Sequence, residues 1–219
     1  MDNRRRMMLA TMGGGGIPLS DLPEGSILKI LEGGVLTDFY VAKHNYESGL
    51  NGAGKTLIVR KDLHSKITFG SGNEYAKSNI SSWLYNSYRP LLDAAVQSSI
   101  TATYFYYTPG NTNHTVTSRK QSFFPLSVTE LGLSHSYANV EGTALPIASI
   151  LRTAYLDGST YPQWTRSPYI DNNNVRAFVV NGGVIATYTD YRYGVRPAFT
   201  LPADAPCKPN ADGSFTLLL

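Results

Sequence analysis

The chain has 219 residues, and 19 Lys and Arg against 16 Asp and Glu give it a formal net charge of +3. Because Arg4, Arg5 and Arg6 supply most of that surplus, the rest of the sequence lacks the charge to build a nucleic-acid-binding face. Charged residues make up only 16%, so Asn, Ser, Thr, Gly and 15 Tyr carry most polar groups. This composition is typical of binding surfaces, where Tyr offers contact area with few rotatable bonds.

Cysteine content and hydropathy exclude several further classes of protein. Cys207 is the only cysteine, so an intramolecular disulfide and a thiolate metal cluster are impossible. No apolar run reaches the ~18 residues of a membrane span. The apolar stretch at residues 7–12 resembles the core of a signal peptide but is too short for one. We therefore expect a globular protein without membrane insertion.

The first elements in chain order are an arm and three strands. Residues 1–20 combine the Arg triplet, an apolar patch and four glycines, which predicts an N-terminal arm used for assembly, before a body over residues 21–219. Short β-branched and aromatic runs at 25–31, 36–43 and 56–61 predict strands separated by glycine-bearing turns.

Residues 49–56 (GLNGAGKT) match the phosphate-binding loop pattern G-x-x-x-x-G-K-[ST]. Such a loop needs a helix at its Lys-Thr end, so that helix N–H groups point at the phosphates. Here the β-branched run Leu57-Ile58-Val59 follows instead. The glycines therefore favour a hairpin turn rather than a nucleotide site.

The middle of the chain predicts two helical segments. Ser78 is a plausible N-cap for a segment over 78–92, which Pro90 should split into two short helices. A second helix is expected over 144–156, with Pro146 in its first turn. Between the two, 103–108 and 121–128 predict extended segments on either side of a polar loop.

The last third predicts short strands at 177–180, 184–186 and 194–202. Arg196 lies in an otherwise apolar strand, so we expect it to be paired and structural. The predicted fold class is α+β, with two helices and many short, mostly antiparallel strands.

Catalytic and metal-binding patterns are weak. His44, His64, His114 and His135 are scattered without a metal-ligand spacing, and no G-x-S-x-G motif is present. Glu130 and Glu141 could form the carboxylate pair of a glycosidase, although nothing singles them out. The sequence therefore predicts no catalytic residue, metal or cofactor.

The segment 164–193 concentrates aromatic, Arg, Asn and Asp residues, as recognition surfaces do. The alternative is an ordinary polar loop over a β-rich core. The candidate ligand-binding residues are Trp164, Arg166, Tyr169, Asp171, Asn172, Asn173, Asn174, Arg176, Phe178, Asn181, Tyr188, Thr189, Asp190, Tyr191 and Arg192.

Five blocks of this sequence resemble a family of uncharacterised proteins from phages and prophages of gut Firmicutes, the DUF6273 type. The blocks are YFYYTPG at 104–110, LSVTELG at 126–132, SYANVEG at 136–142, QWTRSP at 163–168 and GVRPAF at 194–199. The likeness covers roughly residues 20–203.

The GVRPAF block also resembles the ending of C-type-lectin-fold variable proteins, the targets of diversity-generating retroelements, and that of formylglycine-generating-enzyme-like domains. In the variable proteins a hypervariable binding patch precedes this ending. The resemblance implies a C-type-lectin-like fold with a variable patch at 170–193. The formylglycine-generating activity does not carry over, because it needs two active-site cysteines.

The resemblance implies a non-enzymatic receptor-binding protein at a phage or prophage tail tip, recognising a protein or glycan on a bacterial surface. Residues 1–20 would join other tail proteins and gather copies, which we expect to form a trimer, so that avidity strengthens modest contacts. Two alternatives stay open. One is a structural virion or baseplate component, and the other is a cell-wall polysaccharide hydrolase using Glu130, Glu141 or Asp190.

Overall fold

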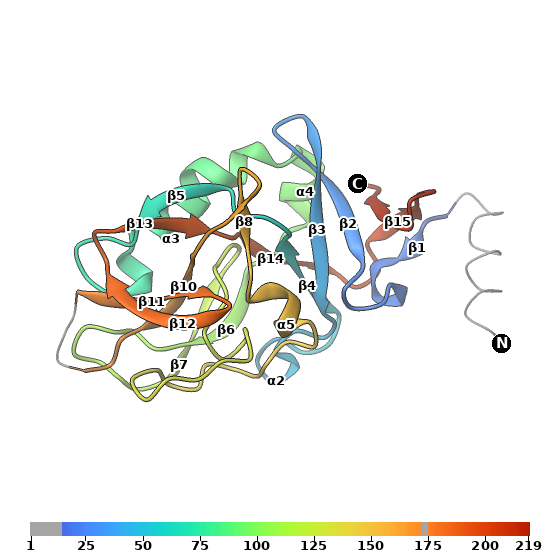
Figure 1. Ribbon diagram of the computed structural model, residues 1–219. Coiled ribbons are helices and arrows are strands. Elements are labelled where there is room, and N and C mark those ends of the chain that lie inside the picture. Colours follow the sequence, from blue (N-terminus) through green and yellow to red (C-terminus); the bar gives the residue numbers. More distant parts are fainter. Residues whose placement is uncertain (1–14, 172–174) are drawn as a thin grey trace.

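The computed structural model describes residues 15–171 and 175–219, and shows an α+β fold of two sheets, two strand pairs and short helices (Figure 1). The expected α+β class is confirmed. Residues 1–14 and the predicted site residues Asn172, Asn173 and Asn174 lie outside the described residues.

The larger sheet has seven strands and brings the two ends of the described chain together. β16 and β2 are parallel neighbours, whereas the other neighbouring strands described in this sheet are antiparallel. In spatial order the strands are β1 (Ile17–Pro18), β15 (Pro206–Pro209), β16 (Phe215–Leu217), β2 (Ile27–Glu32), β3 (Val35–Lys43), β4 (Lys55–Arg60) and β14 (Ala198–Pro202).

The second sheet has five strands and contains most of the segment predicted to recognise a ligand. Its order is β12 (Gly183–Tyr188), β11 (Arg176–Asn181), β10 (Gln163–Pro168), β13 (Arg192–Val195) and β5 (Ser65–Thr68). Two separate strand pairs are β6 (Thr103–Tyr107) with β7 (Thr117–Gln121), and β8 (Tyr155–Leu156) with β9 (Ser159–Thr160).

The helices are short. Ser78 caps the predicted helical segment, since its Oγ accepts from the Ser81 N–H at 3.0 Å. The α-helices are α2 (Ser48–Asn51), α3 (Asn79–Trp83), α4 (Ala94–Ser99) and α5 (Ala148–Leu151). Single turns are the 3-10 turns Leu19–Asp21, Tyr75–Lys77 and Arg89–Leu91 and the π turn Leu84–Tyr88. Among the described residues, none of the helices has the length and apolar character needed to cross a bilayer.

The GVRPAF segment passes from the smaller sheet into the larger one, as β13 leads into β14. Between these strands Arg196 is buried, and its guanidinium donates to the carbonyl oxygens of Leu151, Lys61 and Thr153. Burial lowers the pKa of Arg196 to about 10. Arg196 therefore has the structural position expected of it, with backbone carbonyls rather than a carboxylate as partners.

Three local predictions are wrong. The helix expected over 144–156 shrinks to α5, because extended backbone surrounds that single turn. The extended run at 121–128 makes only an isolated bridge from Phe124 to Ala198, and β7 forms instead inside the predicted polar loop. The body also begins before residue 21, since β1 pairs with β15 and both Ile17 and Leu19 are buried.

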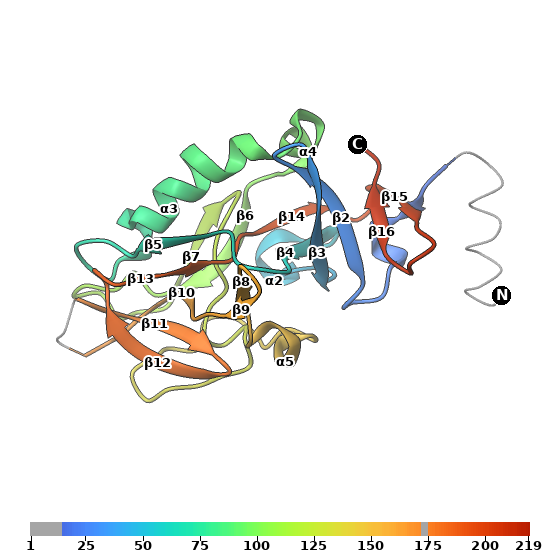
Figure 2. The ribbon, with the colours of Figure 1, turned by 45° about the horizontal axis from the view of Figure 1, so that its top comes forward.

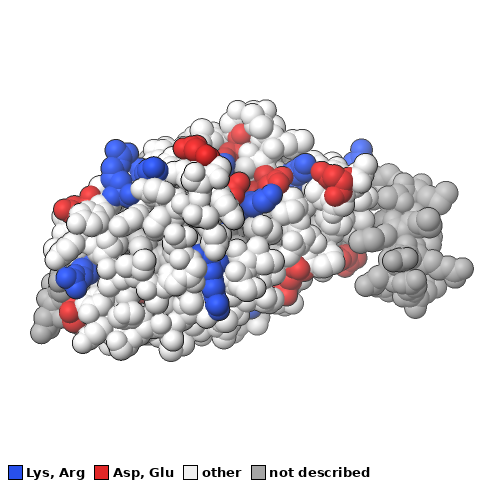
Figure 3. All heavy atoms as spheres, in the orientation of Figure 1, with Lys and Arg blue, Asp and Glu red and all other residues white. Residues whose placement is uncertain are grey.

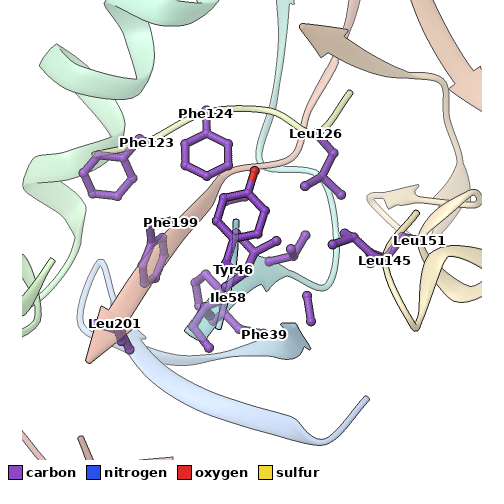
Figure 4. Close-up of a cluster of buried hydrophobic side chains, with 14 of the residues drawn as sticks. Phe39, Tyr46, Ile58, Phe123, Phe124, Leu126, Leu145, Leu151, Phe199 and Leu201 are labelled. Atoms are coloured by element: carbon purple, nitrogen blue, oxygen red, sulfur yellow. The ribbon is translucent and has the colours of Figure 1, made fainter. Parts of the chain in front are cut away.

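The hairpin at the phosphate-loop match is as predicted. β3 and β4 pair antiparallel, with α2 and the glycine turn between them, and strand β4 follows Gly54 directly. The core lies beneath these strands (Figure 4), where Tyr46 lies among Phe39, Phe124 and Phe199.

The two ends of the molecule differ. β1, β15 and β16 gather at one end, and hairpin β11–β12 lies at the opposite end (Figures 1 and 2). On the face drawn in Figure 3, acidic and basic residues are scattered among uncharged ones.

Candidate functional site

The candidate site is built on hairpin β11–β12, at the edge of the five-stranded sheet. Its register runs from Arg176 opposite Tyr188 to Asn181 opposite Gly183, and Gly182 closes the turn at a φ of 76° that favours glycine. β11 is buried from Ala177 to Val180, whereas β12 exposes alternate residues. The hairpin therefore holds one exposed edge on a buried neighbour.

An aromatic strip runs across this end of the molecule; it consists of Tyr137, Tyr169, Arg176, Tyr188 and Tyr191. The rings of Tyr137 and Tyr169 lie 4.7 Å apart, and those of Tyr188 and Tyr191 lie 6.0 Å apart. The Arg176 guanidinium joins the two pairs, because it lies 5.9 Å from the Tyr169 ring and 5.0 Å from the Tyr188 ring. Tyr188 and Tyr191 are 43% and 51% exposed, so the strip faces solvent.

Buried side chains support the strip from below. The Tyr191 ring lies 6.3 Å from that of Tyr193, which meets Trp164 edge-on at 5.2 Å. The Trp164 indole N–H donates to the Ile67 carbonyl at 2.8 Å. Below Tyr169, Phe178 is fully buried with its ring 5.6 Å away. The exposed rings thus rest on rings that the core holds in place.

Four predicted contact residues are wrong because they are buried: Trp164, Arg166, Phe178 and Thr189. Trp164 and Arg166 lie in β10, which has β11 on one side and β13 on the other, and all six residues of this strand are buried. Thr189 is bonded through its backbone to Val175 and Gly70. These four residues can support a contact surface but cannot touch a ligand in this structure.

The other predicted residues lie at or near the surface. Tyr169, Asp171 and Arg176 are half-buried. The exposed members are Asn181, Tyr188, Asp190, Tyr191 and Arg192. The Arg192 guanidinium donates to the Lys66 carbonyl at 3.0 Å, which ties the start of β13 to β5.

Sequence reasoning missed Tyr137, which joins the strip from a loop outside the predicted segment. The Tyr137 carbonyl accepts from the Ile170 N–H at 3.0 Å, so the two loops are joined by their backbones. His135 lies beneath, with its ring 4.8 Å from that of Phe178. An exposed aromatic residue in a polar loop was the available signal, but nothing in the sequence placed that loop beside Tyr169.

Beneath this end lies a buried ionic network centred on Arg166. Its Nη1 bonds a Glu130 carboxylate oxygen at 2.6 Å and the Pro125 carbonyl at 3.0 Å, while Nε donates to the Tyr106 carbonyl. The Tyr46 hydroxyl donates to the other oxygen of Glu130. The charge of Glu130 and burial together raise the pKa of Tyr46, so its proton stays in place.

Glu141 occupies a second fully buried position. It accepts from the Ser167 hydroxyl and from the Thr108 N–H, and burial raises the pKa of its carboxyl. Glu130 and Glu141 are therefore both enclosed by protein, where no glycan reaches them. The expected role of these two residues as an open glycosidase pair is wrong.

Metal chemistry has little support in the described residues, which contain no group of three His, Cys, Asp or Glu side chains arranged to hold an ion. His44 and His114 bond backbone carbonyl oxygens, and His64 bonds the Ser65 hydroxyl. The site can thus offer aromatic, hydroxyl and guanidinium contacts.

The sequence matches the family described as domain of unknown function DUF6273 over residues 53–203. This stretch contains the whole five-stranded sheet and the candidate site, but only β4 and β14 of the seven-stranded sheet. Comparisons with curated proteins and with solved structures found no match.

Proposed function

The chain belongs to the DUF6273 family, and from this premise and its exposed surface we propose a non-enzymatic binding module. It recognises a protein or glycan on a bacterial surface, as the receptor-binding part of a phage or prophage tail tip. Residues 1–20 join it to other tail proteins, and copies assemble as a trimer.

The observation that carries the proposal is the aromatic strip. Tyr and Arg dominate binding energy at protein interfaces, since each covers a large area and offers a polar group at its tip. In the strip Arg176 is already fixed between Tyr169 and Tyr188, to whose hydroxyl it donates at 3.3 Å. Little side-chain entropy is then lost when a ligand binds.

The placement of the strip supports attachment at the other end of the molecule. β1 continues from residues 1–14 at the end opposite to hairpin β11–β12 (Figure 1). A module fixed through its N-terminal residues presents the strip outward. Several copies held side by side bind together even where each contact is weak.

The resemblance of GVRPAF to the ending of C-type-lectin-fold variable proteins supports a finer proposal, a lectin-like arrangement with a variable patch over 170–193. Variation there must spare Ala177 and Val179, which are buried in β11. Sequencing this gene in sibling isolates tests the idea. Substitutions should gather at exposed positions such as Tyr188 and Tyr191, and an even scatter along the chain would contradict a variable patch.

A structural role in the virion or baseplate remains a second candidate, favoured by strand β12. This strand is the edge of its sheet, and Ile185 on it is 53% exposed. An open edge can pair with a strand of a neighbouring chain. In that case the strip would be covered in the assembled particle rather than offered to a host cell.

The test is binding of the fluorescently labelled full chain to a panel of candidate host bacteria. Tyr188→Ala and Tyr191→Ala should each weaken binding about tenfold or more, as for central interface residues. The matched control is Tyr155→Ala, which removes a similarly exposed Tyr from β8 and should leave binding unchanged. Unchanged binding by both strip variants would overturn the proposal, and release of soluble sugar from the cells would favour a hydrolase.

A further inference from the structure

A second concave site lies away from the aromatic strip, between the α3 region and β7. The cavity measures about 330 Å³ and is lined by Ser81 of α3, Tyr85 of the following π turn, and Arg119, Lys120 and Gln121 of β7. This volume lies within the range of small-molecule sites. The strip and this cavity share no residue.

The cavity is positively charged. Arg119 and Lys120 contribute two cations, and none of the described residues lining it is acidic. Lys55 lies close by, because the charge of Lys120 contributes, after burial, to lowering the pKa of the Lys55 ammonium. Cations grouped without a counter-charge attract an anion.

Two buried polar atoms at the cavity lack a hydrogen-bond partner among the described residues: Nε of Arg119 and Oε1 of Gln121. The Gln121 amide is oriented, since its Nε2 donates to the Ser81 hydroxyl oxygen at 3.0 Å. The Arg119 guanidinium lies 5.9 Å from the Tyr107 ring. Leaving such groups unpaired is costly, so a donor and an acceptor are both available to a ligand.

The two unpaired atoms define complementary chemistry. An Arg N–H and a Lys ammonium suit the oxygens of a phosphate or carboxylate. A bare amide oxygen suits a hydroxyl donor. The exposed ring of Tyr85 adds an apolar wall on which a carbon chain can rest.

We propose that this cavity binds an oxyanion carried on a hydroxyl-bearing carbon chain, as in polyol phosphates, sugar phosphates and uronates. Arg119 and Lys120 hold the anionic group, and Gln121 accepts from a hydroxyl of the same ligand. This proposal concerns a separate site and holds whether or not the aromatic strip binds bacteria.

The test is calorimetric titration of the full chain with inorganic phosphate, glycerol 3-phosphate, glucuronate and, as a neutral probe, glycerol. We expect saturable binding of at least one hydroxyl-bearing anion and none of glycerol, and the preferred probe tells a phosphate from a carboxylate. Arg119→Gln should weaken binding about tenfold or more, as for the loss of a charge-assisted hydrogen bond. Lys120→Gln, at an exposed position, should weaken it severalfold without affecting folding.

Arg192→Gln is the matched control, since it removes an exposed Arg from β13, and it should bind as the unaltered chain does. Failure of all three anions to bind, or equal binding by the Arg119, Lys120 and Arg192 variants, would overturn the proposal. Equal affinity for inorganic phosphate and glycerol 3-phosphate would overturn the part assigned to Gln121. Tyr191→Ala should leave anion titrations unchanged, which separates this result from failure of the aromatic strip.

Discussion

At the scale of single residues, Arg166 shows how composition can mislead. Trp and Arg are typical of interfaces, but in β10 both Trp164 and Arg166 point into the protein. Composition does not reveal whether a strand is central or at an edge, and only neighbours β11 and β13 bury β10. The exposed positions Tyr188 and Tyr191 were predictable because they lie in a polar segment that leaves them uncovered.

The ion pair between Arg166 and Glu130 gives a prediction about stability. Arg166→Leu should lower the free energy of unfolding by about 3–5 kcal/mol, because it leaves the Glu130 charge buried without a partner. Urea denaturation followed by fluorescence measures the change. Arg192→Leu, at the surface, should change it by no more than about 0.5 kcal/mol.

The double variant Arg166→Leu with Glu130→Gln isolates the ionic part of this effect. It should be more stable than Arg166→Leu alone, since the unpaired charge is gone. A double variant no more stable than the single one would show that packing around Arg166, and not its charge, determines the loss.

At the scale of elements, the sequence predicted strands better than helices. β2, β3, β4 and β11 were recognisable because β-branched runs ended at glycine-bearing turns. The helix over 144–156 was wrong because its apolar spacing arises from extended chain packing around one turn, α5. β7 was missed since its polar residues pair with β6, a partner that local sequence does not identify.

Gly110 gives a prediction at this scale, because it holds the loop after β6 against the Asn73 backbone. Its φ is +83°, and a Cβ there would lie 2.8 Å from the Asn73 carbonyl oxygen. Gly213 has a φ of +82° but open space around it. Gly213→Ala should therefore cost about 1–2 kcal/mol for the left-handed backbone alone.

Gly110→Ala should cost about 1–3 kcal/mol more than Gly213→Ala, since the added methyl group also displaces Asn73. Thermal unfolding of the two variants gives the comparison. Equal losses would mean that the Asn73 loop moves aside freely.

At the scale of the whole molecule, the two sheets share one core and the continuous β13–β14 segment. We expect them to unfold together. Cys207 in β15 reports on one end, because burial raises its thiol pKa to about 12 and keeps it protonated and unreactive below that pH. Trp164 reports on the other sheet through its fluorescence.

In a urea series, thiol labelling of Cys207 and the fluorescence change should share one midpoint. The fully denatured chain should label rapidly at the same pH and serves as the control. Two separated midpoints would show that the end containing β15 opens on its own. How the sheets join could not be predicted from the sequence, since it depends on pairings between distant segments such as β14 with β4.

The shortest strand determines how this molecule responds to traction. β1 is an outer strand held to β15 by two residue pairs, Ile17 with Cys207 and Pro18 with Pro206, and proline offers no N–H there. A pull on the chain ahead of Ile17, resisted at the distant hairpin, loads these pairs first. Detachment of residues 17–22 would yield about 20 Å of slack, at roughly 3.4 Å per residue, before β2 feels the load. A tethered copy could lengthen by that amount and recoil when the pull ends.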